Sequence, residues 1–289
     1  WMWNNPVLSK EYRLRMRSAR APWMVSVYLL IMGSIVLTYI YLDSVGSGYF
    51  NPEQSRVLFM ILSGLQLILI GFVTPALTAG LISGERERQT LAILLTTNLS
   101  PTSIIVSKLV AALSFMGLLV IASLPLYAIV VLFGGVSPIQ LLQIFIFYAV
   151  TMFFLGSLGV LYSTLLKRTG IATVLAYSTV AVIVIGTMVI GMFAMQFYDF
   201  QHAGAPPSTP PPLWVTIWFL LNPMLDFISI FFAGEVPFIE QTNMNPFYFF
   251  LFVYGLLGAA LLLLSIYVLP PVRRKRRRRK NGTSITKTA

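Results

Sequence analysis

The sequence predicts an all-α membrane protein with six transmembrane helices, and three observations support this fold class. Hydrophobic residues make up 57% of the 289 positions and charged residues only 10%, compared with roughly 25% charged residues in an average soluble domain. Apolar stretches of about 20 residues, long enough to cross a bilayer as a helix, recur along the chain. They are continuous, as over 256–264, whereas the strands of a membrane barrel alternate apolar and polar residues.

The predicted spans cover residues 22–42, 57–82, 102–133, 138–166, 170–198 and 245–269. Lys and Arg in the flanking segments set their orientation, because loops rich in these residues stay in the cytoplasm. The basic clusters fall on the side of the two termini, and only Arg56 falls on the other side. We therefore expect a multi-pass protein of the cell membrane, plasma or inner, with both termini cytoplasmic. The net charge of +11 then reflects topology, and no nucleic-acid partner is expected.

The segment before the first span, residues 4–20, mixes apolar and basic residues. Leu8, Tyr12 and Met16 recur at every fourth position, and Lys10 and Arg13 fall on the opposite face of a helix. This pattern predicts an interfacial helix that lies flat on the inner side of the membrane. A plain basic flank that only fixes orientation is the alternative interpretation.

Proline and small residues predict where the spans bend and where they touch. Pro75 in the second span and Pro125 in the third each remove a backbone donor, so both helices are expected to kink. Gly156 with Gly159 in the fourth span, and the Gly255-x-x-x-Ala259 pair in the sixth, predict close helix contacts. Contacts inside one chain are favoured over a dimer seam, because a bundle of six helices has more internal than external seams.

The stretch 199–244 is predicted to form a cap on the outer side. Five prolines between 206 and 212 prevent a continuous helix, and two short apolar pieces, 213–221 and 224–233, follow them. The first piece carries aromatic side chains suited to the headgroup zone, namely Trp214, Trp218 and Phe219. Two short helices that dip into the outer interface are expected. Such a cap is compatible with gating an exit and with simply sealing the bundle.

Eight consecutive basic residues, 273–280, follow the sixth predicted span. A run of this kind just inside a span attracts anionic lipid, at about 1 kcal/mol per charge near the surface. Nucleic-acid binding and nuclear targeting are the weaker alternatives. We therefore divide the chain into one transmembrane domain, 1–270, and a basic cytoplasmic tail, 271–289.

The sequence lacks the residues of several common chemistries. It has no Cys and a single His, so no metal centre or thiolate nucleophile is expected. It has no phosphate-binding loop, so the chain is predicted to be non-catalytic and to bind no cofactor. No charged residue lies deep within a predicted span, which disfavours an ion-driven carrier as the class of function. The energy source is expected to lie in another chain.

Uncharged polar residues do occur within the second and fifth spans. They are candidates for a translocation path or for a dimer face, and the alternative is hydrogen bonding between helices. The candidates are Ser63, Gln66, Thr74, Thr78, Ser178, Thr179 and Thr187.

The most informative segment is 84–97, between the second and third spans. Residues 85–88 alternate acidic and basic side chains between long apolar stretches, and Leu91, Leu94 and Leu95 follow. Four charges in a row place the segment outside the lipid, and the spacing predicts a short amphipathic helix at the inner surface. Ser100 and Pro101 are expected to cap and begin the next helix, which ties the segment stiffly to the third span. An ordinary cytoplasmic loop is the alternative.

Several motifs occur together around this segment. They are Gly84-Glu85-Arg86-Glu87, Thr90-Leu91, Leu94-Leu95, the Leu99-Ser100-Pro101 turn, Lys108, and, near the amino terminus, Asn5-Pro6-Val7-Leu8 with Lys10, Glu11 and Arg13. This combination resembles the signature of type-2 ABC exporter permeases, and the similarity covers nearly the whole chain. Ala92 stands where an acidic residue is frequent in that family, and the motifs mark the family without marking its cargo.

The resemblance implies specific partners. Segment 84–97 would be the coupling helix, seated on a separate ATPase subunit that binds ATP and Mg²⁺, and a second permease, identical or related, would complete the transporter. Carried over residue by residue, the ATPase contacts would be Glu85, Arg86, Glu87, Arg88, Leu91, Leu94 and Leu95, with Lys10, Glu11 and Arg13 from the segment before the first span. The implied function is ATP-driven export. A non-transporting membrane scaffold or sensor that binds an ATPase and acts on a membrane protein or lipid is the main alternative.

Overall fold

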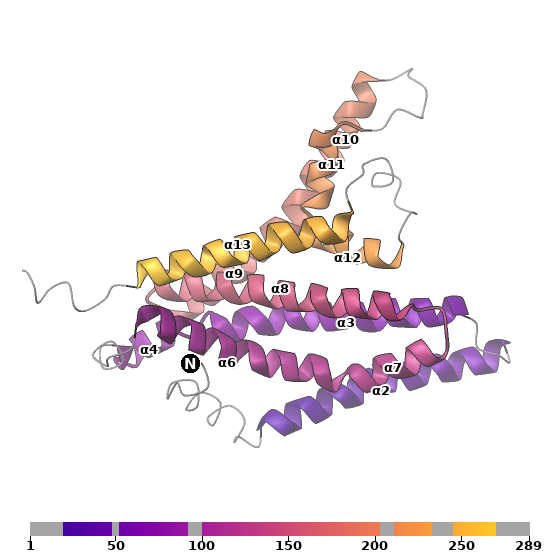
Figure 1. The fold of residues 1–289 in the computed structure, drawn as a ribbon, viewed down its shortest axis with the longest axis horizontal. Coiled ribbons are helices and arrows are strands. Elements are labelled where there is room, and N and C mark those ends of the chain that lie inside the picture. The colour runs from indigo at the N-terminus through magenta and orange to yellow at the C-terminus, as the bar shows by residue number, and fades with distance from the viewer. Residues whose placement is uncertain (1–19, 48–51, 92–99, 203–210, 233–244, 270–289) are drawn as a thin grey trace, which may run out of the picture.

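The computed structural model describes residues 20–47, 52–91, 100–202, 211–232 and 245–269, and within these ranges the chain is all-helical, without strands (Figure 1). Six helical segments are long and apolar enough to cross a membrane, which confirms the six predicted spans. They cover Pro22–Leu42, Glu53–Glu87, Pro101–Leu132, Pro138–Leu165, Thr169–Gln201 and Pro246–Val268. The predicted interfacial helix, apart from its last residue, and the basic tail lie outside the described residues.

The fourth span, α8 (Pro138–Leu165), is the centre of the bundle. It packs against α3 (Pro52–Thr78) and α13 (Pro246–Val268), and Figure 1 shows the three helices running alongside one another. A Cβ atom at Gly159 would collide with the Thr78 side chain, and one at Gly156 would lie 2.9 Å from Leu109 Cδ1. The small residues predicted in this span therefore do form internal contacts.

In α13 the close contact differs from the predicted one. A Cβ atom at Gly255 would meet open space, whereas one at Gly258 would lie 2.8 Å from the Phe153 ring. The reason is helical periodicity: the face of α13 that meets α8 carries Phe250, Tyr254 and Gly258, which recur at every fourth position and are all buried. Gly255 lies off that face, so the favoured prediction of a close contact inside the chain is wrong for Gly255.

Several spans are interrupted. The third divides at Ser123 into α6 (Pro101–Ala122) and α7 (Leu124–Leu132), with Pro125 in the first turn of α7. The fifth consists of α9 (Thr169–Ala181), a π-helical turn η1 (Val182–Gly186) and α10 (Thr187–Gln201). The predicted start of α6 is confirmed, because Ser100 Oγ accepts a hydrogen bond from Ser103 N at 3.2 Å and Pro101 is the first helical residue.

The remaining helices lie at the edges of the bundle. α2 (Arg20–Ser47) packs against α3, α6 and α7. The short helices α11 (Leu213–Leu220) and α12 (Pro223–Phe231) follow α10 and are bent by 87° relative to each other. Figure 1 shows α10 and α11 together, projecting away from the other helices. We call the part of the molecule that contains α10, α11 and α12 the cap end. The opposite part, which contains α4 (Ser83–Glu87), is the α4 end.

Candidate functional site

The charged segment after the second span forms a short helix at the α4 end. α4 ends at Glu87, and Gln89 then adopts a left-handed conformation with φ of 59°. The Thr90 N–H donates to the Glu85 carbonyl at 3.0 Å, so this turn satisfies an acceptor that a longer helix would use internally. The predicted helix over 84–97 is therefore interrupted after residue 87, and residues 92–99 lie outside the described residues.

Glu85 points into the bundle. Its carboxylate accepts a hydrogen bond from Lys108 Nζ at 3.0 Å, and it also accepts one from the Thr90 hydroxyl. Lys108 lies in α6, and only 3% of it is exposed. A buried ammonium group needs a charged partner, because removal from water is costly for an uncompensated ion. Glu85 thus joins α4 to α6.

Arg86 reaches the carboxyl end of α8. Its guanidinium donates to the Leu166 carbonyl at 2.9 Å and to the Thr164 carbonyl at 3.1 Å. The last carbonyls of a helix have no partner within the helix and carry partial negative charge. A cation at this position therefore satisfies both the hydrogen-bonding and the electrostatic requirement of the helix end, and it joins α4 to α8.

Glu87 reaches the amino end of α9. Its carboxylate accepts hydrogen bonds from the Thr169 N–H at 2.7 Å and from the Thr169 hydroxyl at 3.1 Å. The first N–H groups of a helix are unpaired and carry partial positive charge, so an acidic side chain is favourable there. We refer to Glu85, Arg86, Glu87 and Lys108 as the helix-end clamp, because together they join α4 to α6 and to the ends of α8 and α9.

Hydrogen bonds of hydroxyl groups also join α4 to α8 and α9. Ser163 Oγ in α8 accepts hydrogen bonds from the backbone N–H groups of Ile82 and Ser83, at 2.8 and 2.9 Å. The Ser83 hydroxyl lies 3.1 Å from the Thr169 hydroxyl. Sequence reasoning missed Ser163 and Thr169, since hydroxyl residues are common within membrane spans and no local pattern sets these two apart.

The residues proposed to contact an ATPase fall into three groups. Glu85, Arg86 and Glu87 have partners within the chain, as described above. Arg88 is exposed, as is its neighbour Gln89, whereas Leu91 packs partly against the buried cluster that contains Ile82. The others lie outside the described residues, namely Leu94, Leu95, Lys10, Glu11 and Arg13.

The polar candidates of the second span are inside the protein. Ser63, Gln66, Thr74 and Thr78 have no exposed surface, so they do not lie on a face that a second permease could touch. In the fifth span the hydroxyls of Ser178, Thr179 and Thr187 each bond a carbonyl one turn earlier in the same span, and Ser178 is exposed.

Two short helices do form in the predicted cap. Trp214 is 47% exposed, and Trp218 is partly exposed. Phe219 instead faces α10, where a Cβ atom at Gly191 would lie 3.2 Å from its ring. Asn222 joins the two short helices: its Oδ1 accepts from Met224 N at 2.9 Å, and its Nδ2 donates to the Val184 carbonyl in η1 at 2.8 Å. The cap end is thereby attached to the middle of the fifth span.

Comparison with known proteins identifies one family. The family model described as ABC-2 family transporter protein matches residues 5–254. The matched region includes α4, the two cap helices and every predicted span except the last part of the sixth. A search among curated proteins finds no match.

Proposed function

The chain belongs to the ABC-2 family of transporter proteins and is a membrane-spanning permease subunit, and we propose that it couples ATP hydrolysis in a separate ATPase to export of a solute. In this proposal two ATPase chains bind ATP and Mg²⁺ on the cytoplasmic side, and a second permease completes the transporter. The α4 end faces the cytoplasm, in agreement with the basic residues of the loops. The cargo passes between the two permeases and leaves past the cap end.

The observation that carries this proposal is the helix-end clamp. A partner that moves α4 can move membrane helices only if the connection between them does not flex. Glu85 forms a charge-assisted hydrogen bond to Lys108 within α6, and Arg86 and Glu87 form such bonds to the ends of α8 and α9. Charge-assisted hydrogen bonds are roughly twice as strong as neutral ones. Displacement of α4 would therefore be transmitted to α6, α8 and α9 together.

The exposed residues of the same turn supply the docking contact. Arg88 and Gln89 are exposed next to a helix whose neighbouring charges are occupied by contacts within the chain. The charged residues of this segment therefore have two different roles. Glu85, Arg86 and Glu87 hold α4 in place, and Arg88 contacts an acidic position on the ATPase.

Two variants separate docking from coupling. The chain is co-expressed with its partner ATPase, and both co-purification and ATP-dependent transport into vesicles are measured. Arg88→Glu should abolish co-purification. The control is Lys167→Glu, which makes the same change of charge at another exposed basic residue of the α4 end and should leave co-purification intact. The double variant Glu85→Gln/Lys108→Met should retain co-purification and lose most transport.

Other outcomes contradict the proposal in distinguishable ways. Normal co-purification of Arg88→Glu would remove the docking role of Arg88. Normal transport by the Glu85→Gln/Lys108→Met variant would remove the coupling role of the clamp. ATPase binding without transport of any solute by the unmodified complex would favour the scaffold or sensor alternative.

A further inference from the structure

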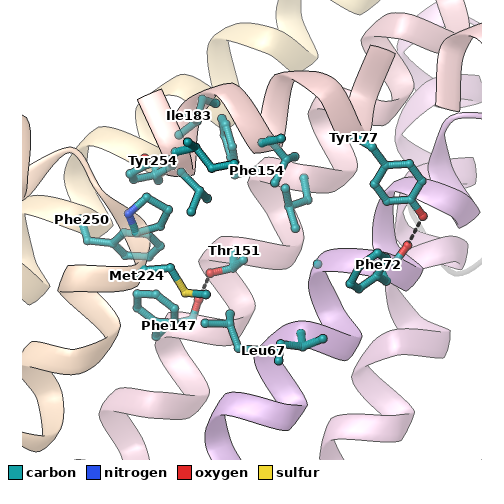
Figure 2. A pocket seen from close by; sticks show the side chains of 18 residues that line it. Leu67, Phe72, Phe147, Thr151, Phe154, Tyr177, Ile183, Met224, Phe250 and Tyr254 are labelled. Atoms are coloured by element: carbon teal, nitrogen blue, oxygen red, sulfur yellow. Dashed lines mark hydrogen bonds between the residues drawn. The ribbon is translucent and has the colours of Figure 1, made fainter. Parts of the chain in front are cut away.

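An apolar cavity of about 420 Å³ lies within the chain, where α3, α8, the α9–η1 segment, α12 and α13 meet (Figure 2). Its volume is within the range of ligand sites, roughly 300–1,000 Å³. One wall is a row of aromatic rings: Phe147 stacks on Phe250 at a centroid distance of 4.2 Å, and Phe250 stacks on Tyr254 at 4.7 Å. Rings that pack on one another in this way give the cavity a firm side.

The cavity offers a ligand almost no hydrogen bonds. Three of its lining residues carry hydroxyls, and each hydroxyl donates to a backbone carbonyl: Thr151 to Phe147 at 2.8 Å, Tyr254 to Leu221 at 2.7 Å, and Tyr177 to Phe72. Figure 2 shows the first and the last of these bonds. None of the lining residues that the structure describes is charged. A polar ligand would lose its water here without compensation, so the chemistry of the walls selects hydrocarbon.

The rim of the cavity is exposed. Ile68 and Phe72 on α3 are 49% and 65% exposed, and Ile185 in η1 is 62% exposed. α3 and the α9–η1 segment belong to segments long and apolar enough to span a membrane. In a bilayer this rim therefore meets acyl chains directly.

We propose that this cavity binds one acyl chain of a membrane lipid. The occupant is a slender hydrocarbon chain and not a second copy of the protein, because five elements of one chain form the walls and the hollow is concave. An acyl chain there would touch both η1 and Met224 at the start of α12, the two elements that Asn222 joins. The lipid would thus stabilise the attachment of the cap end to the fifth span, independently of any ATPase.

Gly71 provides a direct way to fill the cavity. It lines the cavity, and a Cβ atom there would meet nothing within 4 Å, so Gly71→Leu places a side chain in the hollow without a backbone clash. Gly64 lies two turns earlier in the same helix, also has open space at its Cβ position, and does not line the cavity. Gly64→Leu is therefore the matched control.

The full-length chain is reconstituted into phosphatidylcholine vesicles that contain a phosphatidylcholine probe with a diazirine on its acyl chain. After illumination, the modified residues are mapped by mass spectrometry. We expect modification of the buried lining residues Phe154, Leu155 and Tyr254 of α8 and α13, which acyl chains outside the rim do not reach. Gly71→Leu should lower it about tenfold, the effect of excluding two methylene groups from an apolar site, and Gly64→Leu should leave it unchanged.

A second arm tests the source of the hydrocarbon, with a free fatty acid that carries the same diazirine. Stronger modification by the phosphatidylcholine probe supports a bilayer lipid as the occupant. Modification by the fatty acid alone would overturn that assignment. Lining residues unmodified by either probe, or modification equal in Gly71→Leu and the unmodified protein, would overturn the site itself.

Discussion

The start and the middle of the fifth span are held by different chemistry. At the α4 end, Glu87 binds the first residue of α9 within a group of charges that also fixes α6 and α8. At the cap end, the neutral amide of Asn222 binds the Val184 carbonyl, and the Phe219 ring packs on Gly191. Charge-assisted bonds resist displacement more than neutral ones do. The comparison therefore indicates a stiff α4 end, suited to receiving force, and a cap end that rearranges more easily.

The largest expected effect tests the stiff end. Glu85→Gln leaves the buried Lys108 without its carboxylate, which should lower the free energy of unfolding by about 3 kcal/mol. The double variant Glu85→Gln/Lys108→Met should recover most of this loss, because it also removes the buried charge. Denaturant unfolding in detergent measures both. The control is Glu53→Gln, which neutralises an exposed acid at the start of α3. An equal loss of stability in Glu53→Gln would show that the loss in Glu85→Gln does not come from the broken pairing with Lys108.

The next prediction tests the cap end. Asn222→Ala removes both the helix cap of α12 and the bond to Val184, and we expect a loss of about 2 kcal/mol. Asn222→Ser keeps a side-chain oxygen as the cap of α12 and removes the donor to Val184, so about half of that loss should remain. Unfolding under the same conditions makes the two ends directly comparable. A larger loss for Asn222→Ala than for Glu85→Gln would reverse the assignment of stiff and adaptable ends.

The sequence predicted the spans well because lipid imposes a simple requirement. A helix that crosses a bilayer must satisfy its backbone internally and present apolar side chains, so length and composition suffice to locate it. Pro101 after Ser100 likewise marks a helix start through local geometry alone. The π-helical turn was not predictable, because Val182–Gly186 is as apolar as the α-helical turns on either side of it.

The candidate site was predicted less completely, for two physical reasons. Four consecutive charges place α4 outside the lipid. The directions in which the Arg86 and Glu87 side chains point depend on helix ends about 80 positions later in the chain, at Thr164, Leu166 and Thr169. The sequence around Ser63 and Thr74 does not show whether their hydroxyls face lipid, a translocation path or the protein core. The packing of α3 against α8 and its other neighbouring helices places them inside the protein.

The smallest expected effect sharpens the comparison within the α4 end, where Glu87 is exposed and Glu85 is only partly exposed. Glu87→Gln keeps an acceptor for the Thr169 N–H and loses only the charge at the helix terminus, so we expect a loss of no more than about 1 kcal/mol. Hydrogen exchange of the amides in the first turn of α9 should speed up, and Arg88→Gln, the exposed neighbour, should leave it unchanged. If Glu87→Gln instead lowers stability as much as Glu85→Gln, burial is not what makes this end stiff. The clamp would then act through the charge at the start of α9, and the fifth span would be the main recipient of force from α4.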